Sequence, residues 1–131
     1  MTEVLAQPRY LLDSTICIYL LGGLSPQARD RAEQCALGEI ATSSVAYAEV
    51  LRGVDPADER AMAAARSFFA VCSVLPFGVA AAEAYQRVPF RRARFDRLIG
   101  AHALALGLTI VTNNEADYTD IPGLTVENWT Q

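Results

Sequence analysis

Acidic side chains stand in four separate segments of the chain. Asp13 interrupts the apolar run LLDSTICIYLL, Glu49 lies in SSVAYAEVLRG, Asp96 opens FDRLIGAHALALG, and Asp117 lies in TNNEADYTD. Carboxylates packed together without a cation drive at least one of them toward protonation. Hard oxygen ligands without His or Cys suit Mg²⁺ or Mn²⁺. The residue types therefore indicate an acidic metal site. The alternative is that Asp13 and Asp96 cap helices and Glu49 lies on a solvated face.

Strands and helices alternate along the whole sequence and would bring these segments together. We expect strands at residues 9–13, 39–44, 72–77, 108–112 and 124–129. We expect helices at residues 14–22, 25–38, 45–53, 55–70, 78–88 and 95–107, with a loop or short helical turn at 113–123. This alternation predicts an α/β sandwich with a mostly parallel sheet. Ligands of such sheets bind beyond the carboxyl ends of the strands.

Residues that are typical of helix ends support several of these boundaries. Ser25 followed by Pro26 predicts an N-cap and first helical position, with Gly38 as the stop of the same helix. Asp55 followed by Pro56 predicts the start of the fourth helix. Asp13 closes the first strand, which predicts that its carboxylate lies at the mouth of the sheet. The run before it is apolar because a central strand is covered on both faces.

Size and composition fit one domain spanning residues 1–131. The chain is 52% hydrophobic, which argues against disorder. Its three cysteines lack C-x-x-C spacing, so a disulfide framework and a zinc site are both disfavoured, and a reduced, cytoplasmic setting fits best. The apolar run near the N-terminus is broken by Asp13 and ends in Gly-Gly, which predicts neither a signal peptide nor a membrane span.

The net charge of −4 is not that of a protein with a broad basic face. A local basic patch or a bound metal ion remain as sources of positive charge. All 11 basic residues are arginines, and five lie in the short segment RVPFRRARFDR around Asp96. We expect five arginines to contact phosphates. Four come from this segment, namely Arg91, Arg92, Arg94 and Arg97, and the fifth is Arg52. The single histidine, His102, lies in an apolar helix and is expected to be a core residue.

The four acidic segments together resemble the PIN-domain ribonucleases of the VapC toxin type. The matching motifs are LLDSTICIYLL, SSVAYAEVLRG, FDRLIGAHALALG and IVTNNEADYTDIPGLTVENW, which run from about residue 10 to residue 129. The resemblance implies a PIN domain, a Rossmann-like three-layer α/β/α sandwich, with Mg²⁺- or Mn²⁺-dependent cleavage of RNA. It also implies a VapB-type antitoxin as partner, a homodimer, and a hetero-oligomer with that antitoxin.

The resemblance also assigns the acidic residues one by one. Asp13, Glu49 and Asp96 match the first three acids of the family and become the expected metal ligands. The fourth position is open, because Asn114 stands where many members have aspartate and Asp117 follows three residues later. The side chains expected to orient the ligands or a water are Ser14, Thr15, Thr112, Asn113 and Asn114. Thr15 departs from the family, which often has asparagine there, and Ala46 replaces a common hydroxyl.

Two other functions match part of the sequence. A phosphotransfer enzyme of the haloacid-dehalogenase type would use Asp13 as nucleophile, but it needs a second aspartate where Thr15 stands and a lysine that this chain lacks. A catalytically weak PIN-like module that binds RNA or protein remains an alternative, because of the amide at Asn114.

Overall fold

The protein is built on one five-stranded sheet with the strand order β3-β2-β1-β4-β5. The computed structural model describes residues 5–91 and 94–131. Every pairing of neighbouring strands is parallel, which confirms the predicted fold class. The strands are β1 (Tyr10–Leu12), β2 (Ile40–Ser43), β3 (Ser73–Leu75), β4 (Thr109–Thr112) and β5 (Val126–Asn128).

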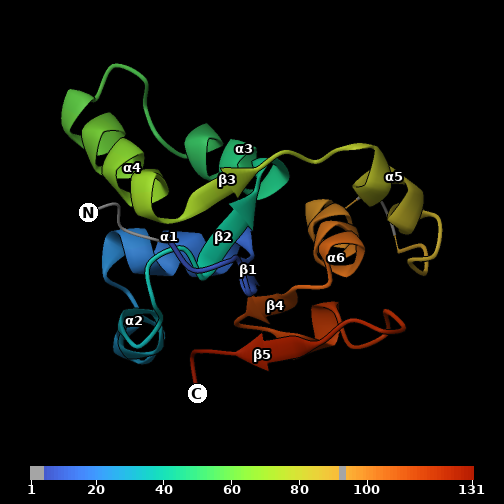
Figure 1. Cartoon of the computed structure of the whole chain (residues 1–131). Coiled ribbons are helices and arrows are strands. Elements are labelled where there is room, and N and C mark those ends of the chain that lie inside the picture. Colours follow the sequence, from blue (N-terminus) through green and yellow to red (C-terminus); the bar gives the residue numbers. More distant parts are fainter. Residues whose placement is uncertain (1–4, 92–93) are drawn as a thin grey trace.

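Helices connect the strands and cover both faces of the sheet (Figure 1). They are α1 (Ser14–Gly22), α2 (Pro26–Glu33), α3 (Ser44–Arg52), α4 (Glu59–Val71), α5 (Val79–Tyr85) and α6 (Phe95–Leu106), with a short 3₁₀ turn η1 (Glu115–Asp117) after β4. In Figure 1, α1 and α2 lie to the left of the central strands, and α5 and α6 lie to the right. This is the three-layer sandwich expected from the sequence. None of the described helices is long and apolar enough to cross a membrane.

Alternating side chains of β1 divide the core in two. Leu11 packs into a cluster that includes Ile99 of α6, whereas Tyr10 and Leu12 pack into a second cluster that includes Ile16 of α1. Successive residues of a strand point to opposite faces, so a strand between two helical layers must be apolar throughout. The three residues of β1 are accordingly all buried.

The strand order places a switch point beside β1. The chain moves from β1 to β2 and β3 in one direction, and then returns to lay β4 on the other side of β1. The connections therefore diverge between β1 and β4, and the carboxyl ends of these two strands open a crevice of the kind that binds ligands in open α/β sheets. Asp13 follows β1 directly at this crevice.

Two predicted helix boundaries differ from the structure by four residues or more. Helix α4 begins at Glu59 and is capped by Asp58, whose carboxylate accepts from Ala61 N–H at 3.0 Å. Asp55 accepts instead from Ala57 N–H at 2.9 Å, which closes a separate turn before the helix. Helix α2 ends at Glu33 and not near Gly38. The predicted N-cap at Ser25 and first helical position at Pro26 are confirmed.

Candidate functional site

Asp13 is the buried carboxylate at the end of the central strand. Its Oδ1 accepts the Ile16 N–H at 2.9 Å, which caps helix α1, and its Oδ2 accepts from the Tyr118 hydroxyl at 3.3 Å. The residue is only 5% exposed. Burial raises the pKa of Asp13 to about 6, although the hydrogen bond from Ile16 works in the opposite direction. The carboxylate therefore lies where a cation would relieve a real desolvation cost.

Glu49 and Asp96 reach the same pocket from helices α3 and α6. Asp96 lies in the first turn of α6, where the helix dipole favours a negative charge. Burial raises the pKa of both carboxyls, and the charge of Asp96 raises the pKa of Glu49 further. Glu49 Oε1 and Asp96 Oδ1 are buried and have no hydrogen-bond partner within the described part of the chain. Two buried oxygens are thus left to accept from a ligand.

Of the two candidates for the fourth acidic position, Asp117 lines the pocket and Asn114 does not. The Asn114 side chain accepts from Ala116 N–H at 3.3 Å and so caps η1. Asp117, at the end of η1, lines the pocket with the other three acids and lies 3.3 Å from Arg94 Nη2. The structure therefore brings Asp117, and not Asn114, together with the other three acids.

These side chains line a pocket of about 300 Å³ at the carboxyl edge of the sheet. The lining residues are Asp13, Ser14, Thr15, Glu49, Arg94, Phe95, Asp96, Asp117 and Tyr118. Four carboxylates and three hydroxyls supply only oxygen as possible ligand atoms, which suits a hard divalent cation. The unpartnered oxygens of Glu49 and Asp96 support the same fit. Within residues 5–91 and 94–131, no three acidic, imidazole or thiol groups are gathered closely enough to hold an ion as they stand.

The remaining residues expected to orient the ligands divide into two groups. Ser14 and Thr15 line the pocket, and a hydrogen bond from Ser14 lowers the pKa of Glu49 against the larger effect of burial. Thr112 lies behind the pocket, fully buried, and its hydroxyl accepts from Asn114 N–H at 3.0 Å. Asn113 turns away, with its amide 3.5 Å from the Tyr19 hydroxyl. Asn113 and Asn114 thus support the loop rather than the pocket.

The arginines expected to bind phosphate do not share one environment. Arg94 pairs with two pocket carboxylates, Arg91 lies 3.2 Å from Asp120, and Arg52 borders a second hollow that adjoins the pocket at Glu49. Arg92 lies outside the described residues.

The prediction for Arg97 was wrong. Its side chain is 1% exposed, and its two terminal nitrogens make bonds of 2.9 Å to both carboxylate oxygens of Asp120. The same nitrogens donate to the carbonyls of Asp117 and Pro89. A guanidinium held in this way fixes the loop after β4 and is not available to a phosphate.

Tyr118 and Phe95 line the pocket without having been predicted. Tyr118 is buried beneath Asp13, and α6 approaches it closely because residue 100 is glycine: a Cβ there would lie 3.3 Å from the Tyr118 ring. Phe95 is 59% exposed at the pocket's edge. The only sign in the sequence that either residue lines the pocket is its neighbour, Asp117 for Tyr118 and Asp96 for Phe95. His102 is buried as expected, with Nδ1 2.8 Å from Ser43 Oγ.

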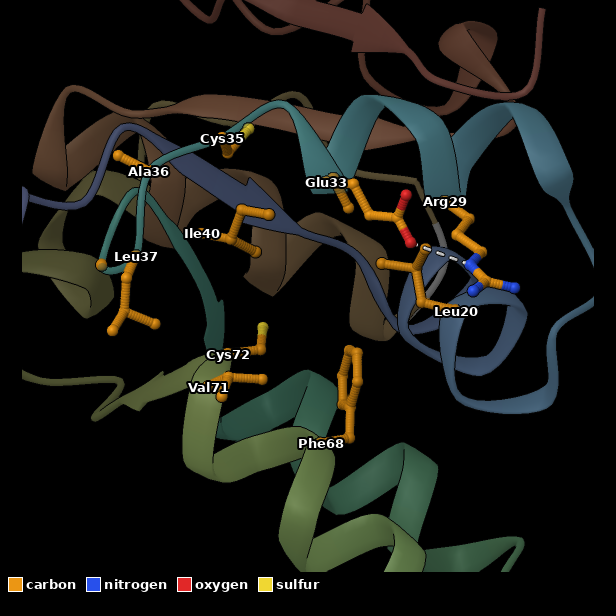
Figure 2. Close-up of a pocket in the computed structure, with 12 residues that line it drawn as sticks. Leu20, Arg29, Glu33, Cys35, Ala36, Leu37, Ile40, Phe68, Val71 and Cys72 are labelled. Carbon is orange, nitrogen blue, oxygen red and sulfur yellow. Dashed lines mark hydrogen bonds and ion pairs between the residues drawn. The ribbon is translucent and has the colours of Figure 1, made fainter.

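A separate apolar pocket of about 240 Å³ lies at the opposite edge of the sheet. It is bordered by Ile40, the first residue of β2, and by Cys72, which precedes β3, so it belongs to the amino ends of the strands. Figure 2 shows Phe68 and Val71 on one side of it and the Arg29–Glu33 ion pair, 3.0 Å long, on the other. Its single carboxylate is already paired, so the chemistry of the acidic pocket has no counterpart here.

The acidic pocket and its sheet have a known family context. The PIN domain family matches residues 10–123, and the chain therefore belongs to the PIN-domain family.

Curated relatives place it beside VapC proteins within that family. The tRNA(fMet)-specific endonuclease VapC of Shigella flexneri is 31% identical over 130 residues, covering 92% of this chain and 98% of the relative. The protein of the same name from Salmonella typhimurium is 28% identical over the same shares.

Solved structures agree with the sequence comparison. A DNA-bound VapBC complex from Salmonella typhimurium matches with a TM-score of 0.82 and 26% identity, over 94% of this chain and 99% of that one. VapBC2 from Rickettsia felis, bound to a promoter DNA fragment, matches with a TM-score of 0.80 and 27% identity, over 92% of this chain and 98% of that one.

Proposed function

We propose that this protein is a metal-dependent endoribonuclease that acts as the toxin of a toxin–antitoxin system. The observation that carries the proposal is the pocket at the β1/β4 switch point, where four carboxylates from four chain segments converge and two buried oxygens lack partners. The names of the VapC relatives support RNA as the substrate, and two of them make tRNA the first RNA to test.

The proposal assigns tasks to five of the pocket residues. A bound Mg²⁺ or Mn²⁺ would supply Lewis acidity, activating a water for in-line attack and offsetting charge on the phosphodiester. Asp13, Glu49, Asp96 and Asp117 would hold the cation. Tyr118 fixes the direction of the Asp13 carboxylate by donating to Oδ2. No nucleophilic side chain is needed, because water is the nucleophile.

The proposal predicts cleavage that depends on both the cation and the carboxylates. Purified protein should cut RNA with Mg²⁺ or Mn²⁺, stop in EDTA and resume when the ion is restored. Asp13→Asn, Glu49→Gln, Asp96→Asn and Asp117→Asn should each lower the single-turnover rate by roughly 100-fold or more, the scale of losing transition-state charge stabilisation. Glu33→Gln is the matched control, because Glu33 pairs with Arg29 far from the pocket. Cleavage that persists in EDTA would rule out the metal mechanism.

A catalytically weak module that binds RNA or protein is the second candidate. It is favoured by Arg94, which already pairs with two of the carboxylates, and by Asn114 in place of an acid. This candidate predicts RNA binding without cleavage under any divalent cation. A metal-dependent product, absent from Asp96→Asn, excludes it.

We further propose one domain over residues 1–131 and a VapB-type antitoxin as partner, with a toxin homodimer inside the hetero-oligomer. The support is that the similar solved structures are VapBC complexes covered over nearly their whole VapC length. An RNA substrate and three free cysteines also fit the cytoplasmic setting expected from the sequence. A protein that stays monomeric in light scattering, with and without a VapB-type antitoxin, would contradict the assembly.

A further inference from the structure

Arg94 places a positive charge between two of the proposed metal ligands. Its Nη2 lies 2.9 Å from Asp96 Oδ2 and 3.3 Å from Asp117 Oδ1. Asp96 comes from the start of α6 and Asp117 from η1, so a single nitrogen bridges two elements of the site. A cation bound to the same two carboxylates would need the space that this guanidinium fills.

The surrounding backbone does not have to move for the guanidinium to leave. Arg97, buried beneath the loop, donates to the Asp117 carbonyl at 2.9 Å and holds Asp120 with both terminal nitrogens. Arg91 Nη1 donates to the Ala116 carbonyl at 3.4 Å. These contacts fix the main chain of η1 independently of Arg94, so exchange of one cation for another requires side-chain rotation alone.

The contacts of Arg94 are of a kind that can be exchanged. Its side chain is 52% exposed, and ion pairs at such positions are weak and screened by solvent. Asp96 Oδ1 remains buried without a partner even while Oδ2 is paired with Arg94. A guanidinium cannot approach all the carboxylates at once, whereas a divalent ion brings twice the charge to a smaller volume.

We propose that Arg94 is an internal competitor of the divalent cation: it neutralises Asp96 and Asp117 in the metal-free protein and is displaced when the ion binds. Arg94 thereby lowers metal affinity while it keeps the empty acidic pocket compact. After displacement, its charged head lies at the rim of the pocket, where RNA phosphates would arrive. This inference rests on the proposed metal-dependent function and adds a determinant of its metal affinity.

The test is direct measurement of Mn²⁺ binding by calorimetry at pH 7.5, without RNA. Arg94→Ala should bind Mn²⁺ tighter than the unsubstituted protein by roughly three- to tenfold, the range that partly exposed ion pairs are worth. Arg87→Ala is the matched control: it removes an exposed arginine from the same segment, but one that lines neither the acidic pocket nor its neighbouring hollow. Its Mn²⁺ affinity should stay within about twofold, which separates lost contact from lost net charge.

A spectroscopic readout follows the arginine itself. In a ¹H–¹⁵N spectrum, the side-chain Nε–H signal that disappears in Arg94→Lys should shift when Mg²⁺ is added, in step with Mg²⁺ binding. Equal Mn²⁺ affinities for Arg94→Ala and the unsubstituted protein, or an Arg94 signal that Mg²⁺ leaves in place, would overturn the inference while leaving the metal site intact. Absence of Mn²⁺ binding in every variant would overturn both the inference and the metal-dependent function. Binding by Arg94→Ala alone would support the inference in its strongest form.

Discussion

The two carboxylate oxygens of Asp13 have different partners. Oδ1 accepts the Ile16 N–H in the first turn of α1, and Oδ2 accepts from the Tyr118 hydroxyl. Asparagine can replace aspartate at an N-cap with little loss, because its carbonyl oxygen accepts the same bond. Asp13→Asn therefore separates the charge of this residue from its structural role.

Comparing this variant with the unsubstituted protein predicts how the free energy of unfolding depends on pH in the absence of metal. A carboxyl whose pKa is about 6 when folded and near 3.8 when unfolded holds its proton longer in the folded state. Its contribution is therefore fully present below about pH 4 and is lost as pH rises through 6. The unfolding free energy of the unsubstituted protein, minus that of Asp13→Asn, should fall by about 2–3 kcal/mol between pH 4 and pH 7.

Urea titrations in EDTA at several pH values measure this difference. Burial lowers the pKa of His102, whose effect on stability runs in the opposite direction, toward greater stability as pH rises. Since His102 is present in both proteins, its effect cancels in the difference. A difference that stays constant across the pH range would contradict the raised pKa of Asp13.

Residue identity predicted the positions of the acidic side chains better than those of the arginines. Asp13, Glu49 and Asp96 were placed correctly around one pocket because parallel strands bring their carboxyl ends to one edge. Arg94 and Arg97 are only three residues apart and share the same chemistry, yet one is half-exposed and the other is buried. Arg97 is buried because it pairs with Asp120, which is distant in the sequence. A contact of this kind cannot be predicted from a local sequence pattern.

At the scale of elements, α4 shows how two equally good signals can compete. Asp55 precedes Pro56 and was predicted as the N-cap, but Asp58 three residues later makes the capping bond to Ala61. Both aspartates are exposed and both accept one backbone N–H, so sequence alone could not rank them. Strand positions were predicted to within two residues, because apolar runs in buried parallel strands are distinctive.

The corrected boundary predicts unequal effects of the same substitution. Asp58→Ala should lower the unfolding free energy by about 1 kcal/mol, the usual cost of losing an N-cap. Asp55→Ala, the matched control, removes a turn bond outside the helix and should cost less than about 0.5 kcal/mol. Chemical denaturation of the two variants measures both values. A larger loss of unfolding free energy in Asp55→Ala than in Asp58→Ala would instead support Asp55 as the N-cap of α4.

At the scale of the whole molecule, binding of RNA must overcome a net charge of −4. In the described part of the chain, the positive charge near the pocket comes from Arg52, Arg91 and Arg94. In the metal-free protein Arg94 is paired with Asp96 and Asp117, which leaves Arg52 and Arg91 for RNA. Two contacts to the phosphates of a single strand predict a slope of about −1.4 for the logarithm of the RNA association constant against the logarithm of salt concentration. Fluorescence anisotropy in EDTA, where cleavage is absent, measures this slope.

One arginine can be removed at a time to locate that charge. Arg52→Ala should reduce the magnitude of the salt slope by about 0.7, the contribution of one contact. Arg66→Ala serves as the control, since Arg66 is exposed on α4 and lines neither the acidic pocket nor its neighbouring hollow. A flat salt dependence in the unsubstituted protein would contradict binding through these arginines.

The strand order also bears on how the protein is made. The hydrogen bond from Tyr118 to Asp13 joins residues 105 positions apart, and β1 cannot complete its pairing until β4 has been synthesised. A nascent chain that has emerged only through α3 carries Asp13 and Glu49 without Asp96, Asp117 or the strand that opens the crevice between them. The complete acidic pocket therefore cannot form until residue 118 has left the ribosome, so the proposed nuclease site is absent during most of biosynthesis.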